Sequence, residues 1–325
     1  MSNQLSTVNF FTPVQDLLPK VEQRMHSQAD GYHPDLGAAL DHLLASGGKR
    51  IRPATVLLMG GLLNGDPDRL ITLAAAVEML HTATLVHDDL IDGSILRRGI
   101  ATLNAKWSAA ATVLSGDFIF ARAAKLAAET NSIKVMRTFA ETLTIIVNGE
   151  ITQLFSKQSL SSRENYNQRI YAKTASLFET ASGSAAVLST SDEAIIEKAR
   201  CYGYSIGMAF QVIDDILDFT ADQSILGKPV ASDLRQGLIT LPAFYYLESH
   251  PGDAALEAIH RGESVNEEKL ASLIDAIRQS GAIHMAMSDA ENYVQQGIDA
   301  LAGLPDNPQH QALEELAWYI VRRNL

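Results

Sequence analysis

The chain has 325 residues and a formal net charge of −12, from 26 Lys and Arg against 38 Asp and Glu. Apolar residues make up 46% of it and charged residues 20%, so a large core can be buried and an intrinsically disordered chain is excluded. The acidic balance argues against a general nucleic-acid-binding protein, which normally presents a basic face. A single cysteine, Cys201, excludes an intramolecular disulfide framework and fits a reducing compartment.

The first residues lack a basic segment followed by an apolar run, so we expect no secretory signal. The most apolar stretches, 54–63 and 71–86, are interrupted by Gly, Thr, Glu or His. Neither reaches the roughly 18 uninterrupted apolar residues of a membrane span. We therefore expect a cytoplasmic protein without stable membrane insertion.

The composition predicts helices throughout, because Ala, Leu, Glu, Gln and Arg dominate and alternating Val, Thr and Tyr runs are scarce. In chain order the predicted helices are 14–29, 35–46, 52–63, 68–92, 101–129, 131–156, 163–189, 192–219, 234–249, 253–261, 267–280, 282–301 and 309–323. Pro19 lies inside the first of these, so that helix is expected to begin later than residue 14. Residues 70–90 are apolar on more than one face, which predicts burial inside a bundle.

No interdomain linker stands out along the chain. We therefore expect an all-α fold with one domain over residues 1–325. The longest polar break between strong helices is 220–233, and a loop of that size in a compact domain is usually functional.

Two acidic clusters carry the chemistry. Asp88, Asp89 and Asp92 form one D-D-x-x-D pattern, and Asp214, Asp215 and Asp218 form the other. Residues three and four apart on a helix are neighbours, so the first and last aspartate of each cluster share a face. Each cluster closes an apolar helix, where unpaired Asp is costly, and such exceptions tend to occur at functional sites. Carboxylates without Cys are hard oxygen ligands that suit Mg²⁺ better than zinc.

The two clusters allow two other interpretations. Each could be a solvated helix end, but two clusters that each close a long apolar helix make this a poor account. A di-iron carboxylate bundle would need Glu-x-x-His pairs on facing helices, and the sequence has none.

Cationic residues lie in similar surroundings, as a phosphorylated ligand would require. Gly47–Pro53 places Lys49, Arg50 and Arg52 in a Gly-rich turn that leads into a helix, where glycine allows close backbone approach and a helix N-terminus favours anions. This is not a GxxxxGK[ST] loop, so nucleotide binding does not follow. The other candidates are Arg97, Arg98, Lys173 and Lys228, with His81 two turns before Asp88.

These segments together resemble the all-trans polyprenyl diphosphate synthases. The matching segments, in order, are GGKRIRP at 47–53, HTATLVHDDLIDGSILRRG at 81–99, GDFIFARA at 116–123, the pair Glu150 and Gln153, YAKTASLF at 171–178, GMAFQVIDDILDFTAD at 207–222 and GKPVASDLRQGLITLP at 227–242. The resemblance covers nearly the whole chain. It implies a single helical bundle around a deep apolar cavity, usually as a homodimer.

The resemblance also implies roles for individual residues. The six aspartates would hold Mg²⁺ ions that bridge the diphosphate of an allylic prenyl substrate; Asp88, Asp89, Asp92, Asp214 and Asp215, with Lys173, would be the catalytic set. Arg97, Lys173, Lys228 and Gln211 would contact that diphosphate. Lys49, Arg52, His81 and Arg98 would bind isopentenyl diphosphate. Thr174 and Phe210 would lie near the reacting carbons, and Arg322 and Arg323 are candidates for closing the site.

The sequence departs from the family pattern at two positions. The family often has Pro where this chain has Ala101, and many members have Lys where this chain has Leu238. The second difference would weaken one diphosphate contact, and neither removes a metal ligand.

The product length follows from the helix before Asp88. Short-chain members of the family tend to place an aromatic residue four or five positions before the first aspartate, or to insert two residues inside the motif, whereas this chain has Ala83 and Thr84 there. We therefore expect hexaprenyl to decaprenyl diphosphate. Candidates for the floor of the cavity are Phe118, Phe120, Met136 and Phe139.

Alternatives remain open at this point. One is a geranylgeranyl or farnesyl diphosphate synthase, and another is the catalytic subunit of a heteromeric synthase. A terpene cyclase shares the first acidic motif, but its second metal motif normally uses Asn, Ser and Glu. A non-catalytic subunit would tend to lose acidic residues, and this chain keeps all six.

Overall fold

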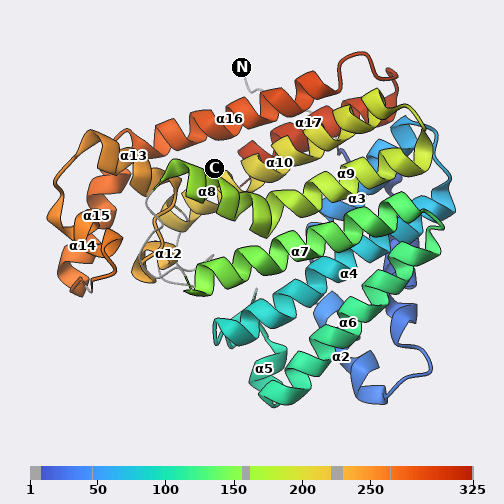
Figure 1. Ribbon diagram of the computed structural model, residues 1–325, viewed down its shortest axis with the longest axis horizontal. Helices are drawn as coiled ribbons and strands as arrows, with labels where there is room; N and C mark the ends of the chain where they lie inside the picture. Colours follow the sequence, from blue (N-terminus) through green and yellow to red (C-terminus); the bar gives the residue numbers. More distant parts are fainter. Residues whose placement is uncertain are drawn as a thin grey trace, which may run out of the picture. The chain divides into compact units, whose positions relative to one another are not determined.

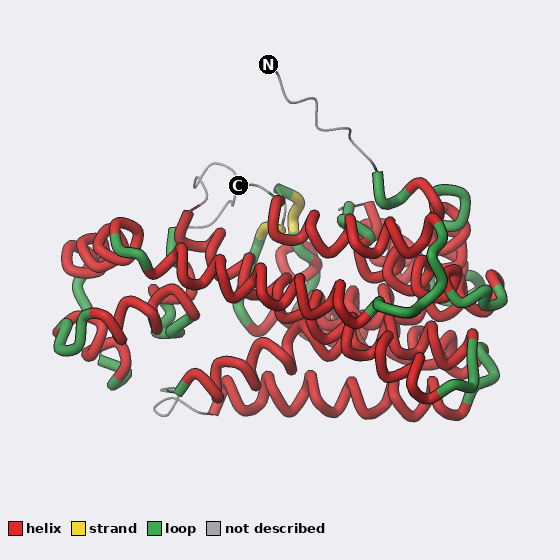
Figure 2. Tube along the Cα trace, turned by 90° about the horizontal axis from the view of Figure 1, so that it is seen from above, coloured by secondary structure: helices red, strands yellow, loops and turns green. Residues whose placement is uncertain are grey.

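The computed structural model describes residues 9–45, 47–97, 99–155, 162–220, 230–263 and 265–323. Almost all of its regular structure is helical, which confirms the all-α prediction (Figures 1 and 2). The elements are η1 (Thr12–Val14), α1 (Leu18–His26), η2 (Ser27–Ala29), α2 (Pro34–Ala45), α3 (Ile51–Leu62), α4 (Pro67–Ile91), β1 (Leu96–Arg97), β2 (Ile100–Ala101), α5 (Leu103–Lys106), α6 (Ala109–Glu129), α7 (Ile133–Phe155), α8 (Arg163–Ile170), η3 (Tyr171–Ala175), α9 (Ser176–Ser189), α10 (Glu193–Thr220), α12 (Ser232–Arg235), α13 (Leu241–Ser249), α14 (Ala254–His260), α15 (Glu267–Gln279), α16 (Ala282–Ala300) and α17 (Pro308–Arg322).

The chain clusters into two compact units. Unit 1 comprises Met1–Ala140, Leu177–Gly203 and Ile298–Tyr319, and unit 2 comprises Glu141–Ser176, Tyr204–Gly297 and Ile320–Leu325. The first acidic cluster belongs to unit 1 and the second to unit 2.

Helix α4 is the centre of unit 1. It begins where the Asp66 side chain accepts hydrogen bonds from the N–H groups of Asp68 and Arg69, with Pro67 in the first turn. It packs against α1, α3 and α6, and nearly every residue from Leu70 to Leu80 is buried. Among the described helices, α4 alone is long and apolar enough to cross a membrane. However, 72% of its most apolar 18-residue stretch is buried within the protein, as in a core helix.

The core of unit 2 surrounds the second half of α10. Its residues Ile206, Val212, Ile213, Ile216 and Phe219 are buried. Tyrosine rings connect three elements, because Tyr204 on α10 contacts Tyr171 on η3 and Tyr293 on α16, with ring centroids 5.7 and 6.4 Å apart. Helix α13 packs against α8 and α15. This core supports the end of α10, where the second acidic cluster lies.

Three predicted boundaries need correction. The predicted helix 101–129 is interrupted, because Trp107 is extended and Ser108 caps a new helix, α6, by accepting from the N–H of Ala111. The predicted helix 234–249 is two helices, α12 and α13, separated at Gly237, whose φ of +82° ends the first. The predicted first helix begins at Leu18, as Pro19 indicated.

Two features were not predicted. Leu96–Arg97 and Ile100–Ala101 pair as two short antiparallel strands, β1 and β2, and Gly99 before β2 has a φ of +77°. Tyr171–Ala175 form a π-helix, η3, within the predicted helix 163–189. Such π turns occur frequently at functional sites. Most of the predicted loop 220–233 lies outside the described residues.

Candidate functional site

The first acidic cluster lies at the C-terminal end of α4. Asp92 is the C-cap, and its N–H donates to the carbonyl of Asp88 at 2.8 Å. Asp88 and Asp92 therefore lie one helical turn apart, as the spacing predicts. Asp88 is half-buried and Asp92 is exposed.

Asp89 differs from its neighbours because it is buried and paired with an arginine. Arg97 Nε donates to both of its carboxylate oxygens, at 2.9 and 3.0 Å, and Arg97 Nη2 lies 2.8 Å from Oδ1. The hairpin formed by β1 and β2 holds Arg97, and the N–H of Ser94 donates to the Asp89 carbonyl at 2.9 Å. The arginine compensates the buried charge and fixes the loop that follows the cluster.

The basic turn before α3 has a strained centre. Arg50 is in the left-handed conformation, with a φ of 47°. Its Nη1 donates to Glu78 at 3.0 Å and its Nε donates to Glu22 at 3.1 Å. Burial would lower the pKa of Arg50, but the two glutamates, Glu78 above all, raise it above its usual value. Arg50 is thus a structural residue that fixes the turn.

The residues on either side of Arg50 are those with a predicted ligand role. Lys49 is exposed, and the guanidinium carbon of Arg52 lies 4.5 Å from the centre of the Phe178 ring. His81, on α4, is half-buried.

The second acidic cluster lies near the end of α10, and each of its aspartates has different partners. Asp214 is half-buried, and Oδ1 accepts from Nη2 of Arg323 at 2.7 Å. The same nitrogen donates to the carbonyl of Phe210, and the guanidinium carbon lies 3.6 Å from the centre of the Phe210 ring. Arg323, a predicted closing residue, thus contacts both the cluster and the helix that carries it.

Asp215 is buried, and both of its oxygens accept hydrogen bonds. Tyr166 Oη donates to Oδ2 at 2.7 Å, and Gln211 Nε2 donates to Oδ1 at 2.9 Å. Thr174 Oγ1 in turn donates to Gln211 Oε1 at 2.6 Å. Burial, together with the charge of Asp233, raises the pKa of Asp215 to about 7, although the two donors act in the opposite direction.

Asp218 caps the segment that follows the undescribed part of the loop. Its Oδ1 accepts from the N–H and the hydroxyl of Ser232, both at 3.0 Å, and its Oδ2 accepts from the N–H of Asp233 at 3.2 Å. The Ala231 N–H donates to the Asp218 carbonyl at 2.7 Å. Asp218 therefore anchors residues 231–233 to the end of α10.

The donors in both clusters fit a hard divalent cation. Within the described part of the chain, no three His, Cys, Asp or Glu side chains converge into a ready-made metal cage. Mg²⁺ does not need one, because it commonly takes one or two carboxylates and completes its shell with water and phosphate oxygens. Each cluster offers such carboxylates by itself: in unit 1, Asp88 and Asp92 lie one turn apart, and in unit 2, Asp214 is half-buried.

Several other predicted residues have defined positions. Lys173 is exposed on η3, and Ala83 is buried on α4. Thr84 Oγ1 donates to the carbonyl of His81 at 2.8 Å. Of the proposed floor residues, Phe120 and Phe139 stack with centroids 6.5 Å apart, whereas Phe118 contacts Tyr32. Arg98 and Lys228 lie outside the described residues.

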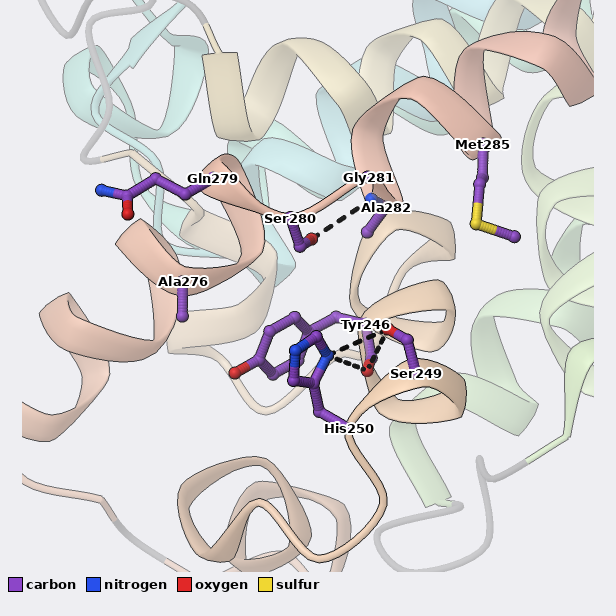
Figure 3. A pocket seen from close by; sticks show the side chains of 9 residues that line it. All are labelled: Tyr246, Ser249, His250, Ala276, Gln279, Ser280, Gly281, Ala282 and Met285. Atoms are coloured by element: carbon purple, nitrogen blue, oxygen red, sulfur yellow. Dashed lines mark hydrogen bonds between the residues drawn. The ribbon is translucent and has the colours of Figure 1, made fainter.

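Unit 2 also holds a pocket of about 370 Å³ that contains none of the predicted site residues. Figure 3 shows the His250 imidazole lying over the Tyr246 ring, with the centroids 4.3 Å apart, beside Ser249. The remaining lining residues are Ala276, Gln279, Ser280, Gly281, Ala282 and Met285. The lining carries no carboxylate, Lys or Arg, so the pocket is unlike a site for a metal diphosphate.

Sequence reasoning missed Tyr166, Ser232 and Asp233 as partners of the second cluster. Tyr166 lies 49 positions before Asp215 in the chain. The sequence marks Tyr166 only as an aromatic residue in a strongly polar segment, RENYNQRI at 163–170. That pattern is common on any helix that packs along one face, so it does not indicate a site residue.

Comparison with known proteins identifies the family. Residues 33–277 match the family model described as polyprenyl synthetase. The chain is 37% identical over 310 residues to heptaprenyl diphosphate synthase component 2 of Geobacillus stearothermophilus, covering 95% of this chain and 96% of the relative. It is also 37% identical over 311 residues to octaprenyl diphosphate synthase of Haemophilus influenzae, covering 94% of each.

A solved structure agrees with these relatives. A polyprenyl synthase from Caulobacter crescentus, determined with calcium and isoprenyl diphosphate, superposes with a TM-score of 0.90 at 38% identity and 97% coverage of both chains. The family depends on divalent metal ions, in keeping with the carboxylate clusters. By its sequence and its all-α fold, the chain belongs to the polyprenyl synthetase family, among the trans-polyprenyl diphosphate synthases of medium- to long-chain type.

Proposed function

We propose that this prenyltransferase condenses isopentenyl diphosphate with an allylic prenyl diphosphate, uses Mg²⁺, and makes products from hexaprenyl to decaprenyl diphosphate. The observation that carries the proposal is the pair of D-D-x-x-D clusters, each at the end of a long buried helix of a family member. The heptaprenyl and octaprenyl synthases among its relatives support the product range over the shorter-chain alternative.

Each cluster would hold Mg²⁺ through its own aspartates, Asp88, Asp89 and Asp92 in unit 1 and Asp214, Asp215 and Asp218 in unit 2. The hydrogen bonds of Asp89, Asp215 and Asp218 orient these carboxylates at the helix ends. When bound, Mg²⁺ neutralises charge on the departing diphosphate. We assign the cationic residues named from the resemblance to the two diphosphates. Isopentenyl diphosphate is bound by Lys49, Arg52, His81 and Arg98. The allylic diphosphate is bound by Arg97, Lys173, Lys228 and the Gln211 amide.

The reaction forms one carbon–carbon bond. The allylic carbon–oxygen bond breaks, and its electron pair leaves with the diphosphate. The double bond of isopentenyl diphosphate attacks the allylic cation, and a proton is then lost to the departed diphosphate. The protein must exclude water from this cation. We assign Thr174 and Phe210 to its surroundings and Arg322 and Arg323 to closing the site.

We further propose that the chain works as a cytoplasmic homodimer with one domain over residues 1–325. Support for the dimer comes from α7, where Val147, Ile151 and Leu154 are 45–48% exposed and Phe155 is 82% exposed. Their spacing of four, three and one residues places them on one side of the helix. An exposed apolar stripe of this kind fits a second copy of the chain.

The first experiment is product analysis. Purified protein is given Mg²⁺, labelled isopentenyl diphosphate and farnesyl diphosphate, and the dephosphorylated products are separated by length. We expect a ladder that ends between the hexaprenyl and decaprenyl alcohols. A ladder that ends at geranylgeraniol would contradict the product range, and incorporation that needs an added partner protein would support a heteromeric synthase instead.

The second experiment tests the metal assignment. Asp88→Ala should cost orders of magnitude in rate with little loss of folding, because the carboxylate lies at the accessible end of α4. Circular dichroism controls for the fold. Full activity of the variant would refute the assignment.

A further inference from the structure

Tyr166 makes a hydrogen bond that the reaction described above does not use. It lies on α8 and is among the largest fully buried side chains of the described residues. Its hydroxyl donates to Asp215 Oδ2 at 2.7 Å, whereas the other partner of that carboxylate, the half-buried Gln211, lies on α10 itself. Tyr166 therefore links the Asp215 carboxylate to a separate helix, α8.

The contact is one end of a chain of four side chains. Thr174 on η3 donates to Gln211, Gln211 donates to one oxygen of Asp215, and Tyr166 donates to the other. A carboxylate with one donor at each oxygen has a fixed plane. Because Thr174 occupies the amide oxygen of Gln211, the amide must present its N–H to Asp215.

Helix α8 is itself held in place on several sides. Arg163 donates to Tyr245 Oη at 2.7 Å and pairs with Asp289 on α16. Arg169 donates to the carbonyl of Ile239 at 2.9 Å, and its guanidinium carbon lies 5.5 Å from the centre of the Tyr166 ring. The Phe244 ring meets the Tyr166 ring edge-on at 6.0 Å. The hydroxyl is thus presented by a rigid support, which is what an orienting contact requires.

We propose that Tyr166 is a positioning residue of the second acidic cluster, whose hydroxyl fixes the Asp215 carboxylate for a divalent cation. The inference rests on the proposed metal role of that cluster. Partners that orient metal-binding carboxylates typically matter by 10- to 100-fold in metal affinity or activity when they are removed. The competing account is a buried hydrogen bond that contributes to stability alone.

The test compares two tyrosines. Tyr166→Phe removes the hydroxyl and keeps the ring. The matched control is Tyr202→Phe. Tyr202 lies on α10, is also fully buried, and donates one hydrogen bond, to the carbonyl of Leu313 at 2.8 Å. Both variants lose one buried hydrogen bond, so a purely structural role predicts similar losses of thermal stability and nothing specific to metal.

Two readouts separate these accounts. The first is Mn²⁺ binding to the protein without substrate, followed by the electron paramagnetic resonance signal of free Mn²⁺. The second is the Mg²⁺ concentration that gives half-maximal condensation. We expect Tyr166→Phe to weaken both by roughly 10- to 100-fold and to recover much of its kcat at saturating Mg²⁺. Tyr202→Phe should stay within about twofold of the parent in both. Unchanged Mn²⁺ and Mg²⁺ dependence in folded Tyr166→Phe would overturn the proposal.

A double mutant shows whether Tyr166 acts through Asp215. If it does, Tyr166→Phe combined with Asp215→Asn loses no more Mn²⁺ affinity than Asp215→Asn alone. Losses that multiply would overturn the proposal. Thr174→Val offers a second route should Tyr166→Phe not fold, because it removes the donor that orients the Gln211 amide, so the other hydrogen bond to the Asp215 carboxylate is less well fixed and Mn²⁺ affinity should again fall.

The same measurements distinguish this inference from the proposed function. If Asp215→Asn weakens Mn²⁺ binding and Tyr166→Phe does not, only the positioning role is wrong. If Asp214→Ala and Asp215→Asn both bind Mn²⁺ like the parent, the metal assignment of the second cluster is wrong, and the role of Tyr166 is wrong with it.

Discussion

Asp215 and Asp89 have the same place in their D-D-x-x-D patterns and are both buried, yet their charges are compensated differently. Asp89 has an arginine at 2.8 Å, whereas Asp215 has a phenol and an amide, which are neutral donors. Burial, reinforced by the charge of Asp233, outweighs the two donors and the charge of Arg169 and raises the pKa of Asp215 to about 7.

The raised pKa predicts the pH dependence of stability in metal-free protein. The folded state binds the proton of Asp215 more tightly than the unfolded state, in which the pKa is near 4. The stabilisation is therefore fully present below about pH 4 and is lost as the pH rises through about 7. In EDTA, Asp215→Asn should unfold at a higher urea concentration than the parent at pH 8, and the difference should shrink toward pH 5. A constant difference in urea midpoint across that range would contradict the raised pKa. The control is Asp92→Asn, which changes an exposed carboxyl and should show no such pH-dependent difference.

At the scale of the element, α4 carries both the first cluster and the residue on which product length is proposed to depend. Ala83→Phe should shorten the longest product to farnesyl or geranylgeranyl diphosphate while the first condensations continue. Ala83 is buried, so the larger ring is also expected to cost about 1–3 kcal/mol of stability. Ala83→Ser keeps a small side chain and should keep the parental products. If Ala83→Phe gives the parental ladder, the growing chain does not pass this residue.

Gly203 on α10 lies against the backbone of α9. A Cβ there would lie 2.4 Å from the carbonyl oxygen of Phe178 and 2.7 Å from Cα of Glu179, both backbone atoms. Gly203→Ala should therefore separate the helices and cost about 3 kcal/mol in urea unfolding. Gly281→Ala, whose Cβ meets nothing within 4 Å, should be nearly neutral. A loss below about 1 kcal/mol for Gly203→Ala would mean that the crossing adjusts freely.

The sequence predicted the helices and both acidic clusters because these are local patterns. Apolar periodicity located α4 and α10, and the D-D-x-x-D spacing located the aspartates on them. The sequence-based prediction failed where a single residue starts or ends an element, as at the N-cap Ser108 and at Gly99 and Gly237, which have positive φ. It also failed for partners distant in sequence, such as Tyr166 and Arg50 with Glu78, because their contacts exist only after tertiary packing.

At the scale of the whole molecule, the proposed dimer depends on the α7 stripe. Ile151→Glu with Leu154→Glu places two charges on it and should convert a dimer to a monomer in sedimentation velocity experiments. Met285→Glu changes an apolar side chain of similar exposure, 46%, on α16 and should leave the dimer intact. A parent protein that sediments as a monomer would show that the stripe serves another purpose.

The π-helix η3 has a consequence for how this chain can vary. Tyr166 and Thr174 lie eight positions apart, and both reach the Asp215 network, one from before the π turn and one from within it. Removing one residue between them would rotate Thr174 by about 100° relative to Tyr166, so only one of the two could keep its contact. The number of intervening residues is therefore fixed by geometry, whereas the identity of an exposed one such as Gln168 is not. Enzymes that share this network should differ in this segment by substitution, and not by insertion or deletion.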